Sequence, residues 1–250
     1  MKKMFSMVLV FTIPIIGHKL NAQTMVTTSS YGLYFRSNMG GDVTLDNNGK
    51  LDNDRNDLSR LQGPLYWNDT FANAKLFLKS GELLGTFPVR FNRFTKQFHV
   101  KFPDAEEDKI VMGNLIGKVI YQGSVNGMNQ PMFTNQYAEK IQLTKGIPEG
   151  FMLQLTNEPM IILKNPQSMV MYKDSLFGTI KKPYLVPEDQ YFVSYKGGFA
   201  EVKKLKAEQF AYQVPALEGY FEWFKKERIR WNDDRDLIRA VEYFNKQQKQ

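Results

Sequence analysis

The sequence contains no cysteine and only two histidines, His18 and His99. Without cysteine the chain forms no disulfide and offers no thiol nucleophile, so its stability must come from a buried core. A shortage of histidine excludes most Ser-His-Asp triads and multi-histidine metal sites. The phosphate-binding loop, Gly-x-Gly-x-x-Gly and Gly-x-Ser-x-Gly patterns are also missing. We therefore expect no catalytic, cofactor-binding or metal-binding residues.

Long apolar runs are missing too. The longest, Phe5–Gly17, has 13 residues, whereas a membrane-spanning helix needs about 20. This run follows Lys2 and Lys3 and ends shortly before Ala22, an order typical of a cleaved secretory signal peptide. We predict that residues 1–22 are such a signal and that the mature chain has no transmembrane helix. The protein would then be exported, to the periplasm or to the cell surface in association with the outer membrane.

A strong excess of one charge is absent as well. The formal net charge is +7. The predicted signal holds three lysines and no acid, so the remainder carries only +4. Such a balance gives no electrostatic reason to expect a nucleic-acid partner.

What the chain does have, from Gly63 onward, is a dense series of aromatic and β-branched residues in short runs separated by turn residues. The segment 97–102 alternates most regularly, with Phe98, Val100 and Phe102 on one face of a predicted strand and His99 on the opposite, solvent-facing side. Runs of this kind every 8–12 residues or so favour an antiparallel meander that forms a sandwich or a partly open barrel.

Two turns and a change of period complete this picture. Asn126-Gly127 and Gly197-Gly198 each favour a tight β-hairpin. After Lys203 the apolar spacing becomes helical, as in Leu237, Val241 and Phe244, with Asn232 as the expected N-cap. The fold class predicted is therefore mainly β, with two or three short C-terminal α-helices packed on the sheet.

The predicted organisation has four parts. They are a signal peptide (1–22), a polar and partly disordered leader (23–62), an antiparallel β domain (63–205) and a C-terminal helical segment (206–250).

Two motifs resemble a pattern found in uncharacterised secreted β-rich proteins of the Bacteroidota. The first combines Gly63, Tyr66, Asn68 and Phe71, followed by Gly81 and by Pro88-Val89-Arg90-Phe91-Asn92, and the second is Tyr243-Phe244-Asn245. Leu65, Trp67, Val89 and Phe91 depart from the usual residues of that pattern without disrupting it. The resemblance covers about residues 63–245 and implies an exported, β-rich cell-envelope protein.

Arg90 is the most informative residue of this pattern. A charged side chain in a strand must pair with an acid or with carbonyl groups if it is buried. One interpretation is a buried ion pair that fixes the fold. The other is a ligand contact beside Tyr66, Trp67 and Asn92, and these four are the candidate site residues.

Two other polar patterns can be explained without a metal-binding or catalytic site. Residues 52–57 begin like a calcium loop, but Asp57 occupies the position that requires glycine, so we expect a solvated loop. Adjacent acids occur at Glu188-Asp189 and Asp233-Asp234. We interpret the first pair as a solvated turn and the second as helix capping.

Three functions remain compatible with the sequence. The preferred one is a non-enzymatic binding or envelope-associated structural protein whose partner is an envelope protein, a glycan or a lipid. A carrier of an apolar ligand is the second, because phenylalanine and methionine are abundant. The third is a glycan hydrolase that uses a pair of carboxylates.

Overall fold

The computed structural model describes residues 35–37, 43–45, 51–56, 62–103, 105–137, 150–174 and 181–249. The predicted signal peptide lies outside these residues. Three short strands, β1 (Phe35–Ser37), β2 (Val43–Leu45) and β3 (Leu51–Asn56), lie within the predicted leader. The segment 52–57 was expected to be a solvated loop, but residues 52–56 belong to β3, which pairs with β2 as a hairpin.

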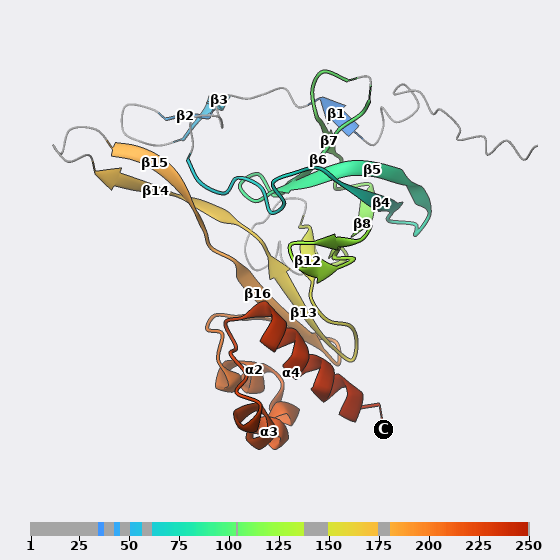
Figure 1. Ribbon diagram of the computed structural model, residues 1–250, viewed down its shortest axis with the longest axis vertical. Coiled ribbons are helices and arrows are strands. Elements are labelled where there is room, and N and C mark those ends of the chain that lie inside the picture. Colours follow the sequence, from blue (N-terminus) through green and yellow to red (C-terminus); the bar gives the residue numbers. More distant parts are fainter. Residues whose placement is uncertain are drawn as a thin grey trace, which may run out of the picture.

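The fold is mainly β, as predicted, and is built on one antiparallel sheet of 11 strands (Figure 1). The strands follow one another across the sheet in the order β1, β7 (Lys109–Val111), β6 (Gln97–Val100), β5 (Leu83–Asn92), β4 (Ala72–Leu78), β8 (Ile116–Tyr121), β11 (Met132–Thr134), β12 (Met152–Gln154), β13 (Met160–Asn165), β16 (Gln190–Tyr195) and β17 (Gly198–Val202).

The expected meander is therefore divided into two runs. Strands β4 to β7 follow one another in sequence order, and the chain then returns so that β8 pairs with β4. From β8 the sheet continues in the other direction to β17. The sheet is open, because β1 and β17 are its two edges and do not pair with each other.

The first part of the sheet is strongly curled. Five strand-to-strand steps separate β6 from β12 in the order of the sheet, which is about 24 Å in a flat sheet. The ring of Phe98 in β6 nevertheless lies only 5.2 Å from that of Phe151, the residue before β12. The two rings can meet only if the strands wrap around them, so this part resembles a partly open barrel.

Aromatic side chains fill the inside of this curl. Phe133 lies 4.8 Å from Phe91 and 5.1 Å from Phe98 between ring centroids, and Tyr121 also packs on it. All four rings are fully buried. Close aromatic pairs contribute about 0.5–1.5 kcal/mol each beyond their burial, so this cluster is a major source of stability.

The motif residues Asn68 and Gly63 have structural roles. Asn68 is buried and accepts hydrogen bonds from the Tyr121 hydroxyl (3.0 Å) and the Phe91 amide (3.1 Å), while it donates to the Val89 carbonyl (3.2 Å). At Gly63 the backbone has φ +111°, and a Cβ would collide with the carbonyl oxygen of Leu185. The first motif is thus explained in part by how this segment attaches to the sheet.

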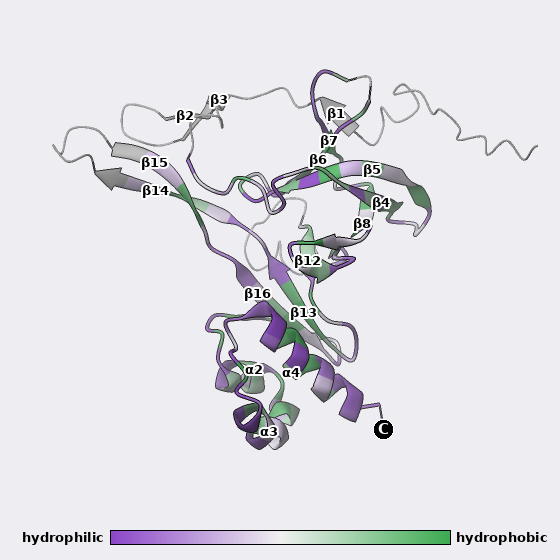
Figure 2. Ribbon diagram, in the orientation of Figure 1, coloured by the Kyte–Doolittle hydropathy of each residue, from purple (hydrophilic) through white to green (hydrophobic). Residues whose placement is uncertain are grey.

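The C-terminal helices cover the last strands of the sheet, as predicted (Figures 1 and 2). They are α2 (Ala207–Gln213), the 3₁₀-helix η3 (Pro215–Tyr220), α3 (Phe221–Lys226) and α4 (Asp234–Gln247). Leu237, Val241 and Phe244 are completely buried. The N-cap of α4 is Asp233 and not Asn232, because the Asp233 carboxylate accepts from the amides of Arg235 and Asp236.

Asn245, in the second motif, fastens α4 to the sheet. Its side chain accepts from the Met160 amide at 2.9 Å and donates to the carbonyls of Met160 and Asn157 at 2.9 and 2.7 Å. These bonds satisfy the backbone at the start of β13, where the ladder of the sheet begins.

Three hairpins stand apart from the large sheet, namely β2–β3, β9 (Ser124–Val125) with β10 (Met128–Asn129), and β14 (Ser168–Asp174) with β15 (Lys181–Pro187). The β9–β10 hairpin has the predicted Asn126-Gly127 turn, with φ of 51° and 76°. The turn between β16 and β17 is shifted by one residue from the prediction, to Lys196 and Gly197. Among the described residues, no helix has the length and apolar character needed to cross a membrane.

Candidate functional site

The four residues predicted as a site occupy neighbouring positions, but their side chains have different partners. Arg90, in β5, lies between two aromatic rings, with its guanidinium carbon 3.8 Å from the Tyr66 ring centroid and 4.4 Å from that of Phe71. Its Nη2 also pairs with Oδ2 of Asp108 at 2.7 Å. The charge is therefore satisfied within the protein by an acid and by cation–π contacts. Of the two interpretations, this geometry agrees with the ion pair that fixes the fold.

His99 differs from the prediction, because it is buried and not solvent-facing. It packs edge-on against Tyr66, with 5.6 Å between ring centroids, and its Nδ1 lies 3.9 Å from the Asp108 carboxylate. Burial and the neighbouring Arg90 charge lower the pKa of His99 to about 4, although Asp108 acts in the opposite direction. Alternation predicted the side of the strand correctly, but Tyr66 and Asp108 cover that side.

Asn92 and Trp67 adjoin the Arg90 cluster through the backbone, since Asn92 pairs with Tyr66 and the Trp67 amide donates to the Phe91 carbonyl, but their side chains have other partners. The Asn92 side chain accepts from the amides of Phe94 and Thr95, each at 2.9 Å, and so shapes the turn after β5. Trp67 packs on Tyr121 and Phe133, and part of its ring lines a groove. Of the four, Trp67 is the one that lines this groove.

This groove is the candidate site. It has a volume of about 1100 Å³ and lies between the curled part of the sheet and the N-terminal half of α4. The β9–β10 hairpin, the residues that follow β12, the adjoining ends of β13 and β16, and α4 contribute its walls. Concave sites of this size at the junction of two parts of a fold are where ligands usually bind.

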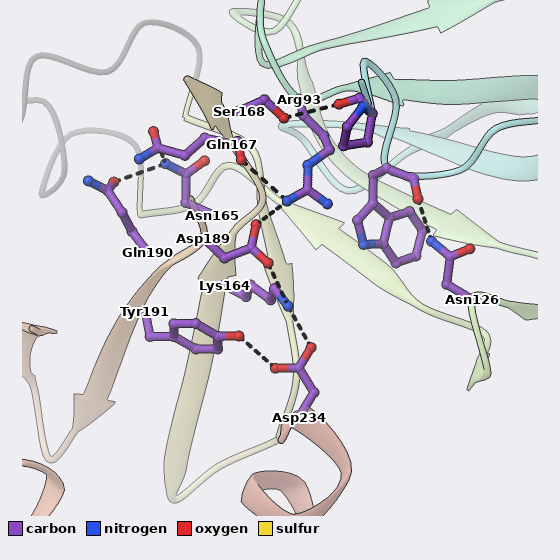
Figure 3. Close-up of polar contacts among 12 residues, drawn as sticks. Arg93, Asn126, Lys164, Asn165, Gln167, Ser168, Asp189, Gln190, Tyr191 and Asp234 are labelled. Atoms are coloured by element: carbon purple, nitrogen blue, oxygen red, sulfur yellow. Dashed lines mark hydrogen bonds and ion pairs between the residues drawn. The ribbon is translucent and has the colours of Figure 1, made fainter. Parts of the chain in front are cut away.

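A chain of alternating charges runs along one wall of the groove (Figure 3). Arg93, in the turn after β5, donates to Asp189 at 2.5 Å. Lys164, in β13, contacts Asp189 at 2.9 Å and Asp234 at 2.6 Å, and Asp234 in turn accepts from the Tyr191 hydroxyl at 2.8 Å. The chain joins the curled sheet, strand β13, the start of β16 and the first residue of α4.

The electrostatics keep this chain charged. Burial alone would lower the pKa of Lys164, but the carboxylates of Asp189 and Asp234 raise it above its ordinary value. Burial, assisted by Asp234 and opposed by Lys164, raises the pKa of Tyr191. Lys164 is therefore a permanent cation held between two anions, and Tyr191 remains a neutral hydrogen-bond donor.

The other walls of the groove are rich in amide side chains. Those that line it are Asn126, Asn129, Gln130, Gln154, Asn157 and Asn232. An amide side chain both donates and accepts hydrogen bonds, so it can match a hydroxyl group in either orientation. Together with the partly exposed Trp67 ring, these walls can bind a polar ligand that has one less polar face.

The arrangement is poorly suited to acid–base catalysis. Asp189 and Asp234 form a facing carboxylate pair. Oδ2 of Asp189 lies 2.9 Å from Nζ of Lys164, and Oδ2 of Asp234 lies 2.6 Å from the same Nζ, so the two carboxylates are close together. Glycoside hydrolysis requires one carboxyl group to donate a proton to the leaving group and the other to act as base or nucleophile, whereas here both carboxylates bind the ammonium of Lys164. Among the described residues, no group of three or more His, Cys, Asp or Glu side chains could hold a metal ion.

Sequence reasoning named Asp189 and Asp234 but assigned them to a solvated turn and to helix capping, and it missed Lys164. The available signal was an acid placed directly before an alternating strand, at Asp189, and a lysine within an otherwise apolar one, at Lys164. Their partners are separated by up to 96 positions in the chain, so no local pattern could pair them.

Comparison of the chain with protein-family models, with curated proteins and with solved structures finds no match. The functional conclusion therefore depends on the geometry of the groove.

Proposed function

We propose that this protein is an exported, non-enzymatic binding protein of the bacterial cell envelope and that its groove binds a glycan. The observation that carries the proposal is the composition of the groove, which six amide residues and the partly exposed Trp67 line together. Amides match the hydroxyl groups of a sugar, and the flat face of an indole covers its less polar C–H face. The predicted signal peptide supports export.

The structural frame of the groove supports binding without turnover. Each residue of the charged chain from Arg93 to Tyr191 contacts another residue of that chain. These contacts fix the groove wall, and they occupy the groups that a reaction would need. A preorganised groove binds more tightly because less conformational entropy is lost on association.

The proposal can be tested through the fluorescence of Trp67. Neutral oligosaccharides such as N-acetylglucosamine tetramers are titrated into the protein, and we expect a saturable change in tryptophan emission. Trp67→Phe should fold, because the aromatic packing on Tyr121 and Phe133 is retained, and should lose most of this change. Trp223→Phe, outside the groove, is the matched control and should keep it. Failure of every oligosaccharide to bind, measured by calorimetry, would contradict the proposal.

Glycan hydrolysis is the alternative that one specific observation favours, namely the facing pair Asp189 and Asp234. The position of Lys164 opposes it. Prolonged incubation of the purified protein with envelope glycans should release no reducing ends. Release that depends on both Asp189 and Asp234 would reverse the order of these two proposals.

The carrier of an apolar ligand is supported less well. The phenylalanines that suggested this function pack directly on one another inside the curl, with ring centroids 4.8 to 5.2 Å apart. They form the hydrophobic core, so a bound ligand is not needed to explain them. Native mass spectrometry of the protein purified from an envelope extract should show no bound lipid.

A further inference from the structure

Six charged side chains line the groove, and they differ in whether the protein itself satisfies them. They are Lys164, Asp189, Asp233, Asp234, Arg235 and Glu242. Four belong to internal pairs, since Lys164, Asp189 and Asp234 form the charged chain and Asp233 caps α4 and contacts Arg230. In the part of the chain that the structure describes, the side chains of Arg235 and Glu242 have no ion pair, and both residues are exposed.

Arg235 and Glu242 lie on the same face of α4. They are seven residues apart, which is about two helical turns and about 10 Å along the axis. Ile238 lies between them and also lines the groove. One long wall of the groove therefore presents a cation, an apolar side chain and an anion in a row.

The two charges also mark the two ends of the groove. The tip of the β9–β10 hairpin lies beside Arg235, because a Cβ on Gly127 would be 3.1 Å from its Nη2. Asn126, next to Gly127, donates to the carbonyl of Trp67. Arg235 thus belongs to the end that contains Trp67. Glu242 precedes Asn245 by one turn, and Asn245 holds the carbonyl of Asn157, so Glu242 belongs to the opposite end.

We infer that the groove selects a zwitterionic glycan, one that carries a carboxylate and a free ammonium group on neighbouring sugar units. The carboxylate pairs with Arg235 at the Trp67 end, and the ammonium pairs with Glu242 at the Asn157 end. This inference rests on the proposed function and adds the charge and the direction of the ligand. The internally paired charges contribute little to this choice, because a ligand would have to break an existing ion pair to reach them.

Four tetrasaccharides of matched length test the inference by calorimetry. The N-acetylglucosamine tetramer is neutral, the glucosamine tetramer is cationic, hyaluronan is anionic, and N-deacetylated hyaluronan is zwitterionic. Each exposed ion pair should strengthen binding by up to about fivefold, so we expect the zwitterion to bind up to about 25-fold more tightly than the neutral tetramer. The advantage should fall as ionic strength rises.

Two variants assign the two charges. Arg235→Gln should remove the gain due to the carboxylate and keep that due to the ammonium, and Glu242→Gln should do the reverse. Both positions are exposed, so both variants should fold. Lys226→Gln and Glu208→Gln, which are exposed outside the groove, are the matched controls and should change nothing.

The outcomes separate the two proposals. Equal affinity for the neutral and zwitterionic tetramers would overturn the inference about charge and leave glycan binding intact. Absence of binding for all four would overturn both. Tighter binding of a peptide that contains lysine and aspartate than of any saccharide would also contradict both, since it would assign the groove to a different class of polymer.

Discussion

Arg90 and Arg93 are separated by only three positions, yet they serve different parts of the molecule. Arg90 lies on the face of β5 opposite to Phe91, between the rings of Tyr66 and Phe71, and its acid is 18 residues away. Arg93 pairs with Asp189, an acid 96 residues away that lines the groove. The first cluster stabilises one wall of the curl, whereas the second joins the curl to the helix-covered end of the sheet.

The difference indicates where rigidity and where binding should be sought. In the Arg90 cluster the charge is held by two aromatic rings and Asp108, and none of these residues lines the groove. The Arg93 chain borders a space that a ligand can enter, and it fixes the relative positions of the groove walls. Substitutions in the Arg90 cluster should therefore alter stability alone. Substitutions in the Arg93 chain should alter stability and glycan binding together.

The largest effect is expected for Lys164→Met. This change leaves Asp189 and Asp234 close together without the cation between them, and removal of one member of a buried charge cluster costs about 3–5 kcal/mol. Denaturant unfolding at pH 7 measures the loss, and glycan affinity should fall as well. Lys203→Met, at an exposed position, should change stability by less than about 0.5 kcal/mol.

The second expected effect belongs to the Arg90 cluster and depends on pH. The folded-state pKa of His99, about 4, is below its ordinary value of 6.5, so the unfolded chain binds more protons between these values. The neutral histidine therefore contributes stability that is fully present above pH 6.5 and is lost as the pH falls through 4. The total is about 3 kcal/mol.

His99→Gln provides the control for this prediction. Carboxylates also titrate near pH 4, so the quantity to compare is the difference in unfolding free energy between the variant and the original protein at each pH. That difference should change steadily between pH 6.5 and 4. A constant difference would show that His99 titrates normally in the folded protein, and glycan affinity should not follow this titration.

The third effect concerns the same junction as the charged chain but involves no charge. Asn245→Ala leaves the buried amide of Met160 without its side-chain partner, which costs about 1–3 kcal/mol, while the Met160 carbonyl keeps the hydrogen bond from the Thr156 hydroxyl. Unlike that of Lys164→Met, this loss should be independent of pH and salt. A marked salt dependence would mean that Asn245 acts through the neighbouring charges.

The smallest effect lies far from both clusters and should have the opposite sign. Arg228 follows α3 with φ 53°, a left-handed conformation that glycine adopts without steric cost, and its side chain is exposed. Arg228→Gly should therefore raise stability by up to about 1 kcal/mol and leave glycan binding unchanged. Thermal unfolding measures this, and a lower melting temperature would contradict it.

The sequence by itself determined the local structure. Alternation at Phe98, Val100 and Phe102 indicated a strand with one buried face, and the stripe of Leu237, Val241 and Phe244 indicated the last helix, because these periods depend on each element alone. The Asn126-Gly127 turn followed in the same way from backbone preference. Two predictions were shifted by one residue, at Asp233 and at Lys196, where neighbouring residues offer similar chemistry, and the loop predicted at 52–57 was wrong because residues 52–56 form strand β3.

Only the tertiary structure decided what covers each exposed-looking face and which charges meet. His99 is buried because Tyr66 and Asp108 cover its side of the strand. The alternation of polar and apolar residues within that strand gives no sign of this cover. The groove exists because the sheet curls and α4 packs on β13, which brings Arg93, Lys164, Asp189 and Asp234 together from distant parts of the chain. Ion pairs depend on distance in space, and a single sequence specifies that distance only through the complete fold.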